Sequence, residues 1–176
     1  MMFNRESLPV LIGALIVVVA QIVIAPNIAL FAAMPNFIVA YVLVVATVRP
    51  SDALYLLAFV LGLISDLLGY GPVGAMPFLL VLASFLVSRV FSALDNGTAF
   101  MPLLVFIAAS FAIELLYAAF LVALGIVPSL LDAFIYRALP CALYDCVCGL
   151  LFYPLGHRFL VLKPLANVAT SKPHFR

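Results

Sequence analysis

Charged residues are scarce in this chain: they make up 9% of its 176 residues, whereas hydrophobic residues make up 68%. A soluble globular domain usually carries about 25% charged residues. The low charge content therefore excludes a soluble domain, and a mean hydropathy of +1.36 indicates a polytopic membrane protein. A chain of this length provides one helical bundle.

Cysteine and histidine are also few. The three cysteines, Cys141, Cys146 and Cys148, lie too close together in one apolar segment to favour disulfides, so we interpret them as small apolar fillers. His157 and His174 lie too far from them to favour a metal site. The sequence also lacks a nucleophile–base arrangement, a phosphate-binding loop and any nucleic-acid-binding feature. It therefore predicts no enzyme activity, no metal, no cofactor and no nucleic-acid partner.

Long apolar runs fill most of the chain. A spanning helix needs about 20 mainly apolar residues, so we expect six, over residues 8–25, 28–48, 52–69, 74–93, 99–124 and 129–156. Pro35 and Asn36 interrupt the second run, which is either one kinked helix or a short span that starts at Pro35 after an interfacial piece. Pro140 lies inside the sixth run, where it should free the carbonyl of Tyr136.

The predicted fold is therefore all-α, a bundle of six transmembrane helices. We expect two parts: a six-helix transmembrane domain over residues 1–156 and a short basic cytoplasmic tail over residues 157–176.

The cations lie on one side of this topology. With six spans, the N-terminus, the second and fourth loops and the C-terminus share a side. That side receives all but one of the eight Lys and Arg residues: Arg5, Arg49, Arg89, Arg158, Lys163, Lys172 and Arg176. Because short cytoplasmic loops carry the excess of basic residues, both termini are predicted to be cytoplasmic.

A small and polar stripe organises the third predicted helix. Gly62, Ser65, Asp66 and Gly69 recur at i, i+3, i+4 and i+7, so they share one helix face. In lipid, small residues let helices approach closely and polar residues hydrogen-bond across the contact. We therefore expect Gly62 to be a helix contact. The turn that follows, from Gly69 through Gly71 and Pro72 to Gly74, should end the helix, because its glycines tolerate φ > 0 and Pro72 fixes φ.

Four ionisable residues remain inside the predicted spans, namely Asp66, Glu114, Arg137 and Asp145. A central charge of the Asp, Lys or Arg type costs about 2.5–3.5 kcal/mol to insert, so these residues should face the bundle interior, a wet cavity or a partner. Helix direction places Asp66 and Arg137 toward the outer side. We therefore expect Arg137 to pair with Asp66 or with the carbonyl freed by Pro140. One cation leaves a surplus of acids, which predicts protonation, solvation or a cation from another chain.

Several of these features also occur together in a known family. Three elements follow each other in the expected order: Pro35-Asn36 before an apolar run, Gly62-x-x-x-Asp66-Leu-Leu with Gly71-Pro72-x-Gly74, and Arg137-x-x-Pro140 in the last helix. The chain therefore resembles the MreD family, bacterial rod shape-determining membrane proteins, over essentially its whole length. Family members often carry Asn at about the position of Asp145.

The resemblance implies a non-enzymatic scaffold of the cell-elongation (rod) complex in the bacterial inner membrane, surrounded by membrane lipid. Such proteins bind MreC and with it link MreB filaments to the RodA polymerase and its penicillin-binding transpeptidase, which regulates cell shape. MreD-like chains are also similar to the six-helix substrate-binding subunits of energy-coupling-factor vitamin transporters, the alternative function. Those subunits tend to carry Ala-x-x-x-Ala in the first helix. Here Ala25, Ala29 and Ala33 straddle Pro26-Asn27, which favours the scaffold.

Overall fold

The computed structural model describes residues 7–29, 33–69, 71–93 and 100–160, with side chains from residue 103 onward in the last range. Within these ranges every regular element is a helix. The elements are α1 (Leu8–Val23), the short 3-10 turn η2 (Ala25–Ile28), α2 (Phe37–Val48), α3 (Asp52–Leu68), α4 (Ala75–Ala93), α5 (Phe100–Ala123), α6 (Leu130–Ala133), η3 (Phe134–Ala138) and α7 (Leu139–Leu160).

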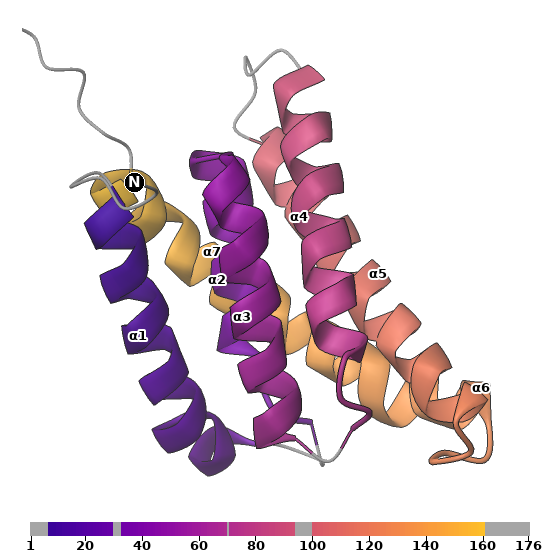
Figure 1. Cartoon of the computed structure of the whole chain (residues 1–176). Coiled ribbons are helices and arrows are strands. Elements are labelled where there is room, and N and C mark those ends of the chain that lie inside the picture. Colours follow the sequence, from indigo (N-terminus) through magenta and orange to yellow (C-terminus); the bar gives the residue numbers. More distant parts are fainter. Residues whose placement is uncertain (1–6, 30–32, 70, 94–99, 161–176) are drawn as a thin grey trace, which may run out of the picture.

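Because α6, η3 and α7 follow each other without a break, the described residues contain six helices, as predicted. Successive helices run in alternating directions (Figure 1). The described parts of the connections before α2, α4 and α6 (residues 24–29 and 33–36, 69 and 71–74, and 124–129) therefore lie at one end of the bundle, the lower end in Figure 1. Three stretches are long and apolar enough to cross a membrane: Ala75–Ala93, Leu103–Ala123 and Leu130–Leu160. Leu8–Val23 and Phe37–Val48 are shorter apolar helices.

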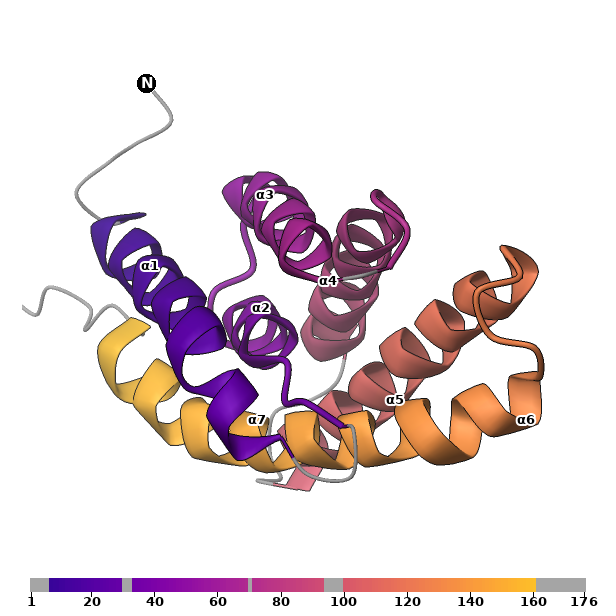
Figure 2. The same cartoon turned by 90° about the horizontal axis from the view of Figure 1, so that it is seen from below.

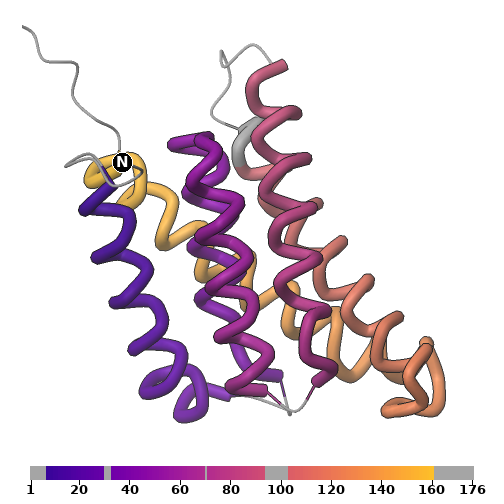
Figure 3. Tube along the Cα trace, in the orientation of Figure 1, coloured from indigo at the N-terminus to yellow at the C-terminus, as the bar shows by residue number. Residues whose placement is uncertain are grey.

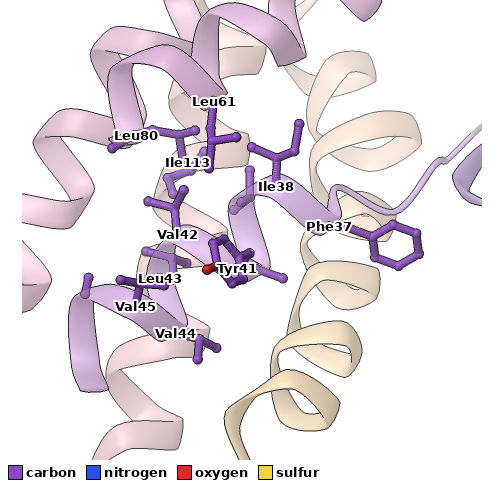
Figure 4. Packing of buried hydrophobic residues seen from close by; sticks show 14 of the residues in the cluster. Phe37, Ile38, Tyr41, Val42, Leu43, Val44, Val45, Leu61, Leu80 and Ile113 are labelled. Carbon is purple, nitrogen blue, oxygen red and sulfur yellow. The ribbon is translucent and has the colours of Figure 1, made fainter. Parts of the chain in front are cut away.

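The centre of the bundle is α2. Its residues from Phe37 to Thr47 are all buried, and Figure 2 shows it surrounded by other helices. Ile38 and Val42 face Leu61 of α3, Leu80 of α4 and Ile113 of α5, whereas Phe37 points the other way (Figure 4). At 1.5 Å per residue its twelve residues extend about 18 Å, less than a hydrocarbon core of about 30 Å.

Pro35 and Asn36 determine where α2 begins. The Asn36 side chain accepts a hydrogen bond from the backbone N–H of Val39 at 3.2 Å, which caps the helix before Phe37. Of the two arrangements that the sequence leaves open for the second run, the structure has the short helix. The 3-10 turn Ala25–Ile28 precedes it, and Ala29 has extended backbone.

The last helix contains a π-helical turn just before Pro140. In η3 the N–H of Leu139 bonds to the carbonyl of Phe134, five residues earlier. This wider turn precedes the proline that lacks an N–H of its own, and the helix continues beyond it. The helix ends at Leu160 rather than at the predicted residue 156.

Close contact between α3 and α4 depends on Gly62. A Cβ at this position would lie 2.6 Å from the Cα and the N of Pro77, backbone atoms of α4. The two helices run side by side along their lengths (Figure 3). No side chain larger than hydrogen fits at residue 62 without moving the helices apart.

The expectation of positive φ at Gly69 and Gly71 is wrong. Gly69 has extended backbone, with φ −99° and ψ −177°, and positive φ occurs instead at Gly74 (108°) and Gly125 (71°). Gly71 is required for space, because a Cβ there would overlap the hydroxyl of Tyr117 on α5. The turn thus uses one glycine for its backbone conformation and another for its contact with α5.

Candidate binding cavity

Asp66 lies at the corner between α3 and α4 and caps the second of these helices. Its carboxylate accepts a hydrogen bond from the N–H of Gly74 at 2.7 Å and from that of Met76 at 3.2 Å. The first N–H groups of a helix have no partner within the helix, and the helix dipole favours an anion there. The acid is only 2% exposed, so its buried oxygens are used by the fold.

Asp145 caps the start of α2 with one oxygen, while its buried Oδ2 has no hydrogen-bond partner in the described part of the chain. Its Oδ1 accepts a hydrogen bond from the N–H of Asn36 at 2.7 Å, across 109 residues of sequence. Gln21 of α1 completes this end of α2, because its Oε1 accepts from the N–H of Phe37 at 2.8 Å and its Nε2 donates to the carbonyl of Pro35 at 3.1 Å. The carbonyl of Pro35 and the N–H groups of Asn36 and Phe37 thereby have hydrogen-bond partners inside the protein.

Glu114, by contrast, caps no helix. It lies on α5, is 3% exposed, and accepts no hydrogen bond from any residue that the structure describes. The nearest cation is Arg137 of η3, which interacts with it electrostatically. The Arg137 guanidinium lies over the ring of Tyr117, with its Cζ 4.8 Å from the ring centroid, and its buried Nε has no hydrogen-bond partner.

The predicted pairing of Arg137 with Asp66 is therefore wrong. No ion pair joins these two described residues, because Asp66 faces the amides of α4 and Arg137 faces Tyr117. The alternative partner, the carbonyl freed by Pro140, is likewise not seen to bond the arginine in the described part of the chain. The physical reason is that the N-terminus of α4 lies within reach of Asp66 and the ring of Tyr117 within reach of Arg137, contacts that depend on the fold.

A cavity of about 560 Å³ opens where these residues meet. Its polar lining residues come from α1, α3, α5, η3 and the segment before α2: Gln21, Asn36, Ser65, Glu114, Tyr117 and Arg137. Its apolar walls include Leu68, Met76, Leu121, Ile126 and Val127. The cavity lies toward the end of the bundle where the connections before α2, α4 and α6 gather, because Pro26, Gly71 and Ile126 of the connections line it. Its size is within the range of about 300–1,000 Å³ that is typical of binding pockets.

The structure divides the residues singled out from the sequence into two groups. Ser65, Gly69, Gly71, Glu114 and Arg137 line the cavity. Gly62, Asp66 and Asp145 are instead buried in contacts between helices, and Gly74 starts α4. Pro140 follows the π-helical turn, and Pro72 accepts a backbone hydrogen bond from Ala75.

Two residues of the site escaped the sequence analysis. Gln21 is the one strongly polar side chain in the apolar run of the first helix, a signal that could have identified it. Tyr117 shares a helix face with Glu114 but carries no charge. Only the fold shows that its ring contacts the Arg137 guanidinium and that its hydroxyl leaves no space for a side chain at Gly71.

The chemistry of the cavity is that of binding. Among the described residues there is no group of three or more His, Cys, Asp or Glu side chains that could hold a metal ion. The three cysteines are buried and unpaired. What the walls offer is one carboxylate, one guanidinium and hydroxyl groups beside an apolar surface. The fold and this site define an all-helical membrane protein with a polar cavity at one end of its bundle.

Comparison with known proteins identifies the family within this class. A family model described as "rod shape-determining protein MreD" matches residues 4–162. The chain therefore belongs to the MreD family, as its sequence features predicted, and its role is in rod shape determination. No curated protein and no solved structure matches the chain.

Proposed function

We propose that this protein is a non-enzymatic scaffold of the bacterial inner membrane that holds MreC. Through MreC it helps to link MreB filaments to RodA and its penicillin-binding transpeptidase. In this proposal all six helices lie in the membrane with both termini in the cytoplasm, so the lower end and its cavity face outward. The cation distribution supports that orientation.

The observation that carries the proposal is the unmatched Glu114. A carboxylate inside a membrane bundle is costly to bury, and this one lines an open cavity without a hydrogen-bond partner among the described residues. A partner segment that enters the cavity would supply what the chain itself does not.

The Gly62–Asp66 stripe is less suited to a partner. Gly62 already contacts the backbone of Pro77, and Asp66 already caps α4. Between this stripe and Glu114, we therefore propose the contact with MreC at Glu114.

Co-purification from native membranes tests the proposal, with MreC and energy-coupling-factor ATPase subunits sought in the same sample. We expect MreC to be recovered with the wild-type chain and lost with Glu114→Gln. The matched control is Asp132→Asn, because Asp132 is an exposed acid on α6 at the same end of the bundle. Absence of MreC from the wild-type sample would refute the scaffold. Equal retention in Glu114→Gln and the control would refute the interface and leave the scaffold standing.

The size of the cavity supports a second candidate, a substrate-binding subunit of a vitamin-type energy-coupling-factor transporter. A cavity of about 560 Å³ could hold a small molecule. Against it, Ala25 lies in a 3-10 turn and Ala29 is extended, so the alanine series forms no helix face for a coupling subunit. Recovery of ATPase subunits with a vitamin-sized ligand, and without MreC, would favour this candidate.

A further inference from the structure

The fold already uses the side chains of three of the six polar residues in the cavity wall. Both polar atoms of the Gln21 side chain bond to the backbone around Pro35 and Phe37. The Asn36 side chain accepts from Val39 and donates to the Ser65 hydroxyl. Of the other three described residues, Tyr117 and Glu114 can accept a hydrogen bond, and Glu114 is the acid.

Arg137 does not neutralise that carboxylate by direct contact. In the described part of the chain no ion pair joins Arg137 to Glu114, and the guanidinium lies instead over the ring of Tyr117. Holding the guanidinium on an aromatic face is itself favourable by about 0.5–2 kcal/mol. The arrangement therefore leaves both oxygens of Glu114 available to a donor that comes from outside.

The apolar lining of the cavity indicates what else the entering side chain must have besides a hydrogen-bond donor. Leu68, Met76, Leu121 and Val127 give the cavity an apolar lining between its opening and the acid. Lysine and arginine combine an apolar stem with a cationic end, and they cover apolar surface with the stem while the charge finds its partner. An apolar side chain would leave Glu114 without a donor, a neutral polar one would leave its charge unbalanced, and an acidic one would add a like charge.

We infer, resting on the proposed function, that the group of MreC that enters this cavity is a lysine or arginine side chain, whose charge pairs with Glu114. The pair forms between chains rather than within one. Recognition then depends on charge as well as on shape, so a partner segment without the cation is rejected.

A double-mutant cycle tests the pair. Each Lys or Arg of the outward-facing, membrane-adjacent part of MreC is replaced by Gln, and its affinity is measured in nanodiscs for wild-type protein, Glu114→Gln and the control Asp132→Asn. We expect one partner substitution to weaken binding at least about 10-fold with the wild type and with the control, and to have no further effect with Glu114→Gln. Additive effects at every basic position would overturn the inference, even if MreC binds and the scaffold stands.

A second measurement does not require MreC. Thermal unfolding of the full chain in detergent is followed with butylammonium chloride, with butanol as the uncharged analogue and sodium chloride as the salt control. We expect butylammonium to raise the Tm of the wild type and of Asp132→Asn, but not that of Glu114→Gln, because a ligand stabilises the state that binds it. Equal shifts in all three chains would overturn the cation site. A shift confined to chains with Glu114, without any coupled residue in MreC, would assign the site to a small amine and overturn the partner side chain.

Discussion

The corner between α3 and α4 and the wall between α5 and η3 each hold a buried acid, but the two acids have different surroundings. Asp66 at the corner accepts bonds from the amides of Gly74, just before α4, and of Met76 in its first turn, so its charge faces the positive end of that helix. Glu114 on the wall meets no helix end, and it faces a cavity beside an arginine that lies on an aromatic ring. An acid in an apolar sequence is thus structural where a helix begins beside it and available for binding where none does.

The largest effect should come from Gly62, which sets the spacing at the Asp66 corner. Gly62→Leu should abolish the folded bundle, because the first added carbon already meets the backbone of Pro77. The matched control is Gly69→Ala on the same stripe, where a Cβ would lie 3.4 Å from the nearest atom, the carbonyl oxygen of Ser65. Monodisperse yield in detergent is the measurement. Equal yields from both variants would remove Gly62 from the helix contact.

Replacing each of the two acids separately by a neutral residue tests the comparison directly. Asp66→Ala should lower the free energy of unfolding by about 2–5 kcal/mol, because the amides of Gly74 and Met76 lose their acceptor. Glu114→Gln should leave that free energy within about 1 kcal/mol of the wild type, since an amide of the same size removes no hydrogen bond of the fold. Both values follow from SDS titration in mixed micelles. A Glu114→Gln protein as unstable as Asp66→Ala would make both acids structural.

Substitution of Gly71 tests whether this position needs glycine for lack of space or for its backbone conformation. Gly71→Ala should be less stable than the wild type by about 1–3 kcal/mol, because the added carbon overlaps the Tyr117 hydroxyl. Adding Tyr117→Phe removes that hydroxyl and should restore part of the loss, as measured by the same titration. If the second substitution gives no recovery, the contact with Tyr117 is not the cause.

The smallest effect is expected at Asp145. Asp145→Asn should remain within about 1 kcal/mol of the wild type, because an amide oxygen can accept the same bond from the Asn36 N–H. Asp145→Ala removes that acceptor and should cost about 1–3 kcal/mol. Thermal unfolding of the two variants side by side gives the comparison. A large loss in the Asn variant would show that the charge itself is needed at the start of α2.

The sequence predicts local features of this fold well. Apolar run lengths locate the six helices, and Pro35-Asn36 marks a break because a proline and a capping residue act on their immediate neighbours. The family resemblance was equally accessible, because it rests on short patterns around Asp66 and Arg137. What the sequence could not show is which acid meets which helix end. Asn36 and Asp145 are 109 residues apart, and nothing near either residue indicates their contact.

The central position of α2 has a consequence for how the protein is made. This helix is too short to cross a hydrocarbon core alone, and its first amides depend on Gln21, made before it, and on Asp145, made long after it. During synthesis the N-terminal helices therefore reach the membrane while the start of α2 still lacks its acceptor. Only when the last helix arrives can the bundle close around α2. Chains that stop before Asp145 should be degraded rather than accumulate as partial bundles.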